Sequence, residues 1–142
     1  MKNRRLAREL VLQLLYQREL ASLDEEVSSD PEKLLEGITL TGSAGGFCKE
    51  LIGGVLVHIE ELDAIIEPYC EHWSIDRMSV VDRNILRIGV FELRFLPDIP
   101  FKVSIDEAVE LAKLFGSEDS GSFINGILDA LAKDLNVESS EG

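Results

Sequence analysis

The sequence predicts an all-α protein of about seven helices, and two kinds of observation support this fold class. Apolar residues recur with the 3.6-residue period of amphipathic helices, and no segment shows the sustained two-residue alternation of a strand. Helix start signals occur before several of these periodic segments. With 142 residues, 45% of them hydrophobic and 29% charged, the chain can bury a core as one domain, 1–142.

The first predicted helix runs from about Arg4 to Ala21, where apolar residues form one face. The acidic connection Asp24 to Glu32 follows and ends on Asp30-Pro31, a favourable cap and first helical position. We expect a short helix after Pro31 that ends near Gly37 to Gly42. Residues Thr41 to Gly46 are then expected to form a loop.

The middle of the chain predicts one or two further helices and then a central one. The apolar period here is formed by Phe47, Leu51, Val55, Ile59 and Leu62. Gly53-Gly54 is expected to kink this region or to permit close helix contact. Ser79 then resembles the N-cap of a capping box in which Asp82 replaces the usual Glu. The stretch Ile85 to Leu96 is apolar on nearly every side, so we expect a central helix that ends at the prolines after it.

The next predicted helix begins at Ser104, with Glu107 as its capping-box partner and Val103 with Ala108 as the hydrophobic staple. Gly116 lies where a left-handed C-terminal cap is expected. A last helix follows, with apolar stripes made of Phe123, Ile124, Ile127, Leu128, Leu131 and Leu135. The polar tail, about 136–142, is expected to fray.

Charge is unevenly distributed along the chain. The first eight residues hold Lys2, Arg4, Arg5 and Arg8 and no acid, whereas the remainder holds 10 basic and all 27 acidic side chains. This basic arm, residues 1–8, is a candidate phosphate contact, because cations neutralise phosphates and release counterions. The acidic body repels bulk nucleic acid, so we expect a local contact that needs a second, basic protein. A merely solvated arm is the alternative.

A second candidate RNA contact lies near the last helix. The segment Ser117 to Phe123 predicts a helix start rich in hydroxyls and free backbone N–H groups, which can hold phosphate. Phe123 is either a platform on which an unstacked base stacks or a core residue. Tyr69 and Lys102 could join this surface.

The remaining polar clusters do not indicate an enzyme. Asp63, Glu67 and Glu71 are four residues apart, and we interpret them as a solvated face rather than a metal or acid–base site. Cys70 and His72 could ligate zinc, but no second ligand pair follows. Their preferred interpretation is packing beside Trp73, and His58 is interpreted as structural.

Other motifs and targeting signals are equally unsupported. Gly42 to Gly46 is neither a dinucleotide fingerprint nor a P-loop. Cys48 and Cys70 have no paired spacing, which favours reduced thiols in a cytoplasmic protein. No run approaches the ~20 apolar residues of a membrane span. We therefore predict a non-enzymatic protein without cofactor or metal.

Four stretches carry a recognisable, collinear pattern: Arg4–Glu9 continuing to Tyr16, Asp82–Leu93, Lys102–Lys113 and Phe123–Leu128. Together they resemble the NusB family of bacterial antitermination factors. The resemblance extends from Arg4 to about Leu135 and implies two small helical bundles packed together. It implies a factor that binds boxA RNA of nascent transcripts, notably ribosomal RNA leaders, with the small-subunit ribosomal protein NusE. It also implies an antitermination complex with NusA, NusG and RNA polymerase.

The resemblance also implies roles for particular residues. The implied RNA-binding residues are Arg4, Arg5, Arg8, Lys102 and Phe123. Tyr16 and Asp82 are implied at or near the NusE and RNA surfaces, and Asp119 near the boundary between them. A homodimer of the free protein is left open.

The chain departs from the family pattern at a few positions of this surface. Leu6 interrupts an arginine run, Phe101 stands where Tyr can occur, and Gly121-Ser122 stand where a basic residue is common. Each change removes a phosphate or polar contact, so we expect low RNA affinity without a partner. The acidic body would steer a basic partner such as a ribosomal protein.

Two alternative functions are weighed against this one. The first is an RNA-binding module related to the N-terminal domain of ribosomal RNA cytosine methyltransferases. Because the sequence stops at Gly142, we expect no methyl-transfer domain to accompany it. The second is a helical adaptor that does not bind RNA.

Overall fold

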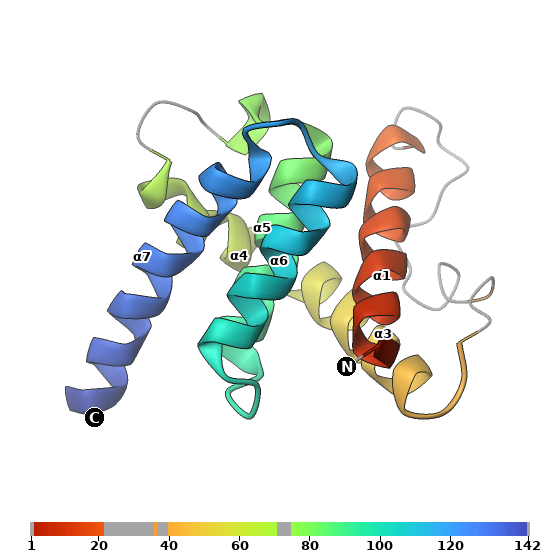
Figure 1. Ribbon diagram of the computed structural model, residues 1–142, viewed down its shortest axis with the longest axis horizontal. Helices are drawn as coiled ribbons and strands as arrows, with labels where there is room; N and C mark the ends of the chain where they lie inside the picture. Colours follow the sequence, from red (N-terminus) through yellow and green to blue (C-terminus); the bar gives the residue numbers. More distant parts are fainter. Residues whose placement is uncertain (1, 22–35, 37–39, 71–74, 142) are drawn as a thin grey trace. The chain divides into compact units, whose positions relative to one another are not determined.

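The computed structural model describes residues 2–21, 36, 40–70 and 75–141, without the side chains of 2, 3, 21, 76 and 137–141. Over these residues every regular element is a helix, so the all-α prediction is confirmed (Figure 1). The chain divides into two compact units, Met1–Ile59 and Glu60–Gly142. The short helix predicted after Pro31 lies outside the described residues. No described helix is both long and apolar enough to cross a membrane.

The first unit contains α1 (Lys2–Ala21) packed against α3 (Gly42–Val57) (Figure 1). The predicted first helix is thus confirmed. The buried apolar side chains on these helices are Ala7, Val11, Leu12 and Leu15 on α1, and Ala44, Phe47, Cys48, Leu51, Ile52 and Val55 on α3.

The loop predicted at Thr41 to Gly46 is wrong, because Thr41 is the N-cap of α3 and the helix begins at Gly42. Glycine clusters are typical of loops, but Gly45 permits close packing inside the helix instead. A Cβ on Gly45 would lie 2.6 Å from the carbonyl oxygen of Leu40. The helix also continues through Gly53-Gly54, and the chain leaves it at His58, the C-cap.

The second unit is built around α5 (Val80–Phe95), α6 (Phe101–Phe115) and α7 (Ser120–Glu141), each of which packs against the other two. The unit also contains α4 (Ile59–Ile66), except for its first residue, and the 3-10 turns η1 (Glu67–Tyr69) and η2 (Ile75–Arg77).

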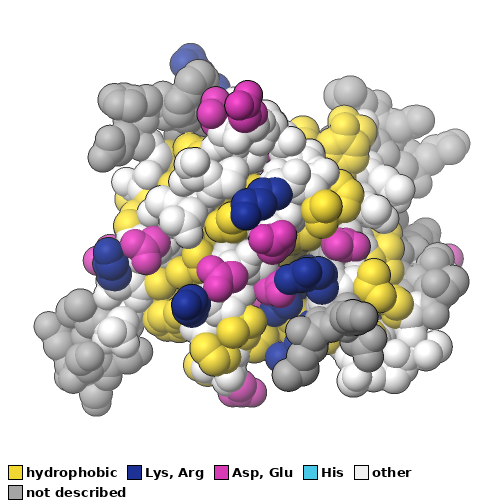
Figure 2. Space-filling model, in the orientation of Figure 1, with side chains coloured by type: hydrophobic (Ala, Val, Ile, Leu, Met, Phe, Trp, Pro, Cys, Tyr) yellow, Lys and Arg dark blue, Asp and Glu magenta, His cyan; other side chains and the backbone are white. Residues whose placement is uncertain are grey.

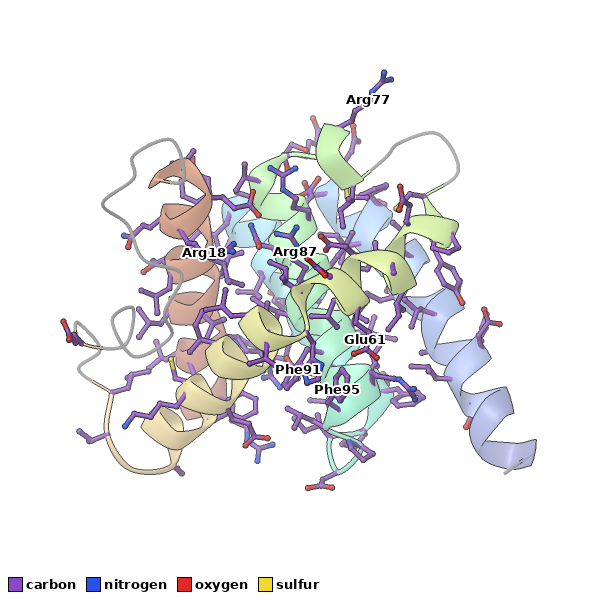
Figure 3. The ribbon with its side chains drawn as sticks, turned by 180° about the vertical axis from the view of Figure 1, so that it is seen from behind. Arg18, Glu61, Arg77, Arg87, Phe91 and Phe95 are labelled. Carbon is purple, nitrogen blue, oxygen red and sulfur yellow. The ribbon has the colours of Figure 1, made fainter. Side chains whose placement is uncertain are left out.

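The prediction that α5 is a central helix is confirmed, since every residue from Asn84 to Leu93 is buried. Near its end Phe91 and Phe95 stack with ring centroids 5.2 Å apart (Figure 3). The predicted cap of this helix is confirmed as well. The hydroxyl of Ser79 accepts a hydrogen bond from the Asp82 backbone N–H at 3.1 Å.

The predicted start of α6 at Ser104 is wrong, since Pro100 is the N-cap and Phe101 the first helical residue. Ser104 lies one turn inside the helix, where its buried hydroxyl donates a hydrogen bond to Oε1 of Glu92 at 3.0 Å. Val103 is exposed, so the predicted hydrophobic staple is also absent from this turn. The capping-box pattern was misleading because the hydroxyl is used across the core.

Gly116 is the C-cap of α6, but the left-handed conformation predicted for it is wrong. Its backbone is extended, with φ −94° and ψ −170°. The glycine is needed for space, because a Cβ there would lie 2.6 Å from Oγ of Ser120. The last helix, α7, continues to Glu141, into the segment that was expected to fray.

Candidate nucleic-acid interface

Residues 2–8 of the basic arm form the first turns of α1. Arg4 and Arg5 are exposed, whereas Arg8, one turn after Arg4, is only 3% exposed. The guanidinium carbons of Arg4 and Arg8 lie 4.8 Å and 5.2 Å from the ring centroid of Phe47 on α3. Two of the three predicted arginine contacts therefore share one aromatic ring inside the first unit.

This placement separates the arginines by accessibility. Arg4 and Arg5 present their charge to solvent, where a phosphate could reach them. Arg8 is buried against Phe47, so in this conformation it supports the arm more readily than it contacts a ligand; its RNA contact stays a prediction. Sequence reasoning placed Phe47 in an apolar stripe and missed its contact with the arginines. That contact arises only when α3 packs against α1.

The helix dipole makes this cationic turn a favourable place for an anion. The first turn of α1 contains no acidic residue, although the N-terminal end of a helix has a partial positive charge. Cations at this end are unfavourable, by about 0.3–1 kcal/mol each when exposed. A bound phosphate would relieve that repulsion and also accept hydrogen bonds.

In the second unit, three predicted residues come together in one depression of about 340 Å³. Asp82 from α5, Asp119 from the α6–α7 connection and Phe123 from α7 line it, together with Arg77, Met78, Ser117 and Ser120. The Phe123 side chain is half-buried, so its ring is neither a fully exposed platform nor a core residue. Arg77 extends outward from η2 (Figure 3). The depression thus offers an aromatic ring flanked by two carboxylates and one cation.

The backbone near this depression is less available to a phosphate than the sequence suggested. The N–H of Ser117 donates to Oγ of Ser120 at 2.9 Å, and the N–H of Ser120 donates to the carbonyl of Ser117 at 3.1 Å. The two hydroxyls also share a hydrogen bond. These two N–H groups are therefore used within the chain.

Asp82 has an unusual oxygen in this region. Its Oδ1 is buried, and no hydrogen-bond partner for it lies among the described residues. A buried acceptor without a donor is costly. Because this oxygen has almost no accessible surface, the N–H group of a binding partner would reach it only after neighbouring side chains move, and the place of Asp82 at a partner surface stays a prediction.

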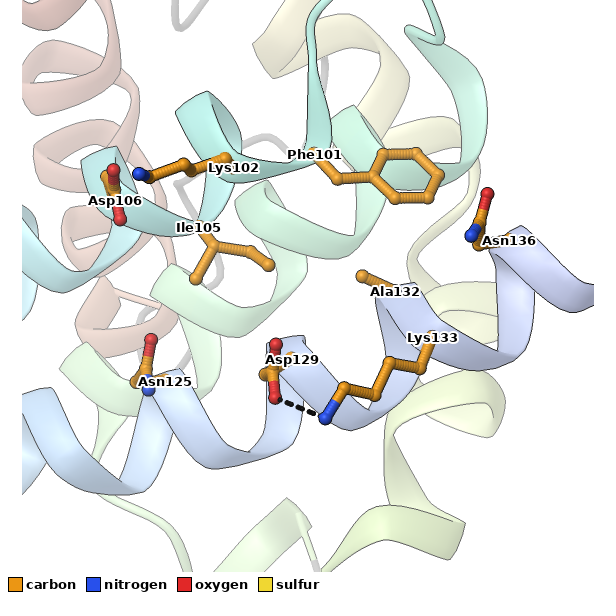
Figure 4. A pocket seen from close by; sticks show the side chains of 9 residues that line it. All are labelled: Phe101, Lys102, Ile105, Asp106, Asn125, Asp129, Ala132, Lys133 and Asn136. Carbon is orange, nitrogen blue, oxygen red and sulfur yellow. Dashed lines mark ion pairs between the residues drawn. The ribbon is translucent and has the colours of Figure 1, made fainter.

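Lys102 and Tyr69 line depressions other than that of Phe123. Lys102 lies in a groove of about 630 Å³ along α6 and α7, which Phe101, Ile105 and Ala132 line with apolar surface (Figure 4). Tyr69 lies in a third depression, of about 590 Å³, and its hydroxyl is hydrogen-bonded to Asp134. The groove with Lys102 also contains a 3.1 Å ion pair between Lys133 and Asp129.

Two further features of α1 lie outside the arginine arm. Tyr16 is 39% exposed, as its predicted role at a partner surface requires, and Leu20 beyond it is also exposed. Arg18 was not singled out from the sequence. Its Nε is buried without a hydrogen-bond partner among the described residues, and its position is labelled in Figure 3.

The interpretation of Asp63 as part of a solvated face is wrong. Asp63 on α4 accepts hydrogen bonds from Nε and Nη2 of Arg87 on α5 at 2.7 Å and 2.8 Å. Arg87 also donates to Oδ1 of Asn84 at 3.0 Å. Because Arg87 is buried, the Asp63 carboxylate neutralises a buried cation. Glu67 is exposed, and Glu71 lies outside the described residues.

The cysteines are poor candidates for metal ligands. Burial raises the pKa of the Cys48 thiol, and burial followed by the charge of Glu67 raises that of Cys70. Thiols with raised pKa values are less able to supply the thiolate that zinc binds. The described part of the chain contains no group of three metal-ligating side chains. His72 and Trp73 lie outside the described residues, and His58 is half-buried.

Charge is mixed over the face that Figure 2 shows. Basic and acidic side chains there are interspersed among apolar ones, in agreement with an acidic protein whose cations are spread out beyond the arm. A nucleic acid would therefore be attracted locally rather than by a broad positive surface.

Comparison with known proteins identifies the family. The family model for NusB matches residues 5–133. The chain is 48% identical over 135 residues to the transcription antitermination protein NusB of Myxococcus xanthus, covering 94% of this chain and 96% of that protein. The corresponding protein of Geobacter sulfurreducens is 47% identical, with 93% and 95% covered.

Solved structures agree with this result. T. maritima NusB superposes with a TM-score of 0.82 at 41% identity, covering 92% of this chain and 90% of that one. A chain from the crystal structure of antitermination factors NusB and NusE in complex with double-stranded RNA gives a TM-score of 0.77 at 34% identity, covering 94% and 98%. The fold, the motifs and these similarities together establish that the chain belongs to the NusB family.

Proposed function

We propose that this protein is a transcription antitermination factor that binds boxA-type single-stranded RNA of nascent ribosomal transcripts together with NusE. We further propose that it acts in the cytoplasm, within a complex that contains NusA, NusG and RNA polymerase. The observation that carries the proposal is the pair of exposed arginines, Arg4 and Arg5, on the first turn of a chain with net charge −13. Membership of a family of antitermination proteins supports it.

The RNA would meet two chemically different regions. Arg4 and Arg5 supply charge for phosphates, and Arg8 contributes from its buried position beside Phe47. Phe123 supplies a partly accessible ring for base stacking, and stacking on an aromatic ring tolerates different bases. Lys102 and Tyr69 would add contacts from two other depressions rather than from the same one.

A basic partner would complete the site. Tyr16 is exposed, Asp119 lies beside Phe123, and Asp82 has a buried oxygen without a donor among the described residues. A positively charged ribosomal protein would be attracted by the acidic body and could supply donors to the exposed groups of Asp119 and Tyr16. A structural neighbour with NusE and RNA in its crystal supports this assembly. Departures such as Leu6 and Phe101 make the partner more important for affinity.

The proposal is tested by titrating labelled RNA with the full chain, with and without NusE. Three RNAs are compared: a boxA oligonucleotide, a scrambled single strand and a duplex. We expect the boxA strand with NusE to bind most tightly. Replacing Arg4 and Arg5 together by Ala should weaken binding to all RNAs and reduce the logarithmic salt slope by about 0.7 for each lost phosphate contact.

Lys49→Ala is the matched control, because Lys49 is an exposed cation on α3 outside the proposed surface. It should leave the salt slope unchanged. Binding to NusE without any effect on RNA would favour the helical adaptor instead. Absence of binding to RNA and NusE, separately and mixed at low salt, would refute the proposal. Sedimentation of the free protein shows whether a homodimer competes for the same surface.

A further inference from the structure

We propose that Phe47 is a positioning residue for RNA binding, because its ring holds the guanidinium groups of Arg4 and Arg8 in place on the arm. This inference rests on the proposed RNA-binding function and assigns a role to a residue on a different helix. The arginines are on α1 and the ring is on α3, so the arm depends on the packing of the first unit.

The contacts have the geometry that this role requires. Both guanidinium carbons lie within 5.2 Å of the ring centroid, inside the ~6 Å range of a cation–π interaction. Phe47 is 8% exposed and Arg8 is 3% exposed, so ring and inner cation are shielded from water. Arg4 is exposed and lies at the outer end of the pair. The ring therefore connects a buried cation to an accessible one.

An aromatic partner preserves the ability of Arg4 to bind phosphate. Among the residues that the structure describes, no carboxylate forms an ion pair with Arg4, and its guanidinium lies over the Phe47 ring. The ring attracts the cation through its π face and uses no N–H donor in a conventional hydrogen bond. Arg87 in the same chain shows the contrast, since Asp63 occupies two of its donor nitrogens and neutralises its charge. With respect to the residues that the structure describes, Arg4 retains both its charge and its donors.

The ring also reduces two costs of building a cationic arm. Like charges four residues apart on a helix repel each other, and Arg4 and Arg8 have this spacing. A shared ring attracts both and offsets that repulsion. Long side chains also lose rotamer freedom when they bind, and a side chain that is already held loses less. Phe47 would thus raise RNA affinity without touching RNA.

The test compares Phe47→Leu with Phe47→Tyr. Leucine preserves much of the apolar volume but removes the π face, whereas tyrosine retains it. We expect Phe47→Leu to weaken RNA binding about two- to tenfold, the factor that corresponds to immobilising one long side chain. Phe47→Tyr should bind within about twofold of the wild type. Phe91→Leu is the matched control, because Phe91 is a similarly buried ring on α5, in the second unit, where it stacks on Phe95.

A double-mutant cycle separates positioning from general packing. If Phe47 acts through Arg4, Phe47→Leu should cause a smaller loss of RNA affinity in an Arg4→Ala background than in the wild type. NMR gives a readout that needs no RNA: the Arg4 side-chain resonances should be shifted upfield by the ring current and return toward ordinary values in Phe47→Leu. Thermal unfolding checks that each variant is folded.

The outcomes distinguish this inference from the proposed function. Equal losses of affinity in both backgrounds, or no ring-current shift in the wild type, would overturn the positioning role while leaving the RNA-binding function intact. A Phe91→Leu variant that weakens RNA binding as much as Phe47→Leu would also overturn it. If the wild type shows the ring-current shift but binds no RNA with or without NusE, both the proposed function and this role are overturned.

Discussion

Removal of the Asp63 carboxylate should strongly destabilise the second unit. In the structure Asp63 pairs in bidentate fashion with Arg87, and the side chains of Asp63 and Arg87 are 26% and 9% exposed. Breaking a buried ion pair costs about 3–5 kcal/mol, because the remaining charge is left buried without its partner. Because Asp63 is partly exposed, we expect Asp63→Ala to lower the free energy of unfolding by about 3 kcal/mol, the lower end of this range. For a chain of this size the melting temperature should fall by roughly 6–12 °C.

The assay is urea unfolding followed by circular dichroism, with Asp129→Ala as the matched control. Asp129 pairs with Lys133 on the surface, where both side chains are more than half exposed, so its loss should cost about 0.3–0.5 kcal/mol. The double variant Asp63→Leu with Arg87→Met should recover part of the stability, because no buried charge remains, although the buried Asn84 oxygen loses the donor that Arg87 supplied. A cost below about 1 kcal/mol for Asp63→Ala would refute the reasoning.

Three further predictions concern other parts of the chain. Phe123→Ala should lower RNA affinity by about 1–3 kcal/mol while the protein stays folded; RNA titration checks this, and unaltered affinity would contradict the stacking role. Gly116→Ala should lower the free energy of unfolding by about 1–3 kcal/mol, because its Cβ would lie 2.8 Å from the Ala112 carbonyl oxygen. Gly126→Ala should be neutral or stabilising, because a Cβ there meets nothing within 4 Å. Equal melting temperatures for the two variants would contradict this prediction. Burial raises the pKa of the Cys48 thiol above its ordinary 9.0, so the thiol of the unfolded chain ionises at a lower pH than that of the folded chain. The free energy of unfolding should therefore fall as the pH rises above about 9. Denaturant titrations at about pH 8 and 10 should show a smaller fall for Cys48→Ala than for the wild type.

Errors made from the sequence share one physical origin. Ser104 fits the pattern of a capping box, yet its hydroxyl donates a hydrogen bond to Glu92. Gly116 fits the pattern of a left-handed cap, yet its lack of a side chain makes space for Ser120. Local patterns record which conformations a residue favours. They do not record which side chain from another helix will occupy the same space or need the same hydrogen bond.

In the candidate site, the sequence also identified residues but not their surroundings. The residues that resemble the NusB family could be identified because they cluster in the chain, as those of the arginine arm do. The burial and the neighbours of these residues could not be predicted from the sequence. Arg8 is buried beside Phe47, and Lys102, Tyr69 and Phe123 line three separate depressions. Accessibility depends on the packing of helices, which no local spacing specifies.

The amino-acid sequence by itself determined that this protein is helical, that it is acidic overall and that its first eight residues carry cations without any acid. Periodicity and charge can be read in this way because they are properties of residues close together in the chain. It was also sufficient for recognising the NusB family. The tertiary structure alone decided that Asp63 neutralises Arg87 and that Phe47 lies against two arginines. Those contacts join residues more than twenty positions apart, and such pairs form only when separate helices come together.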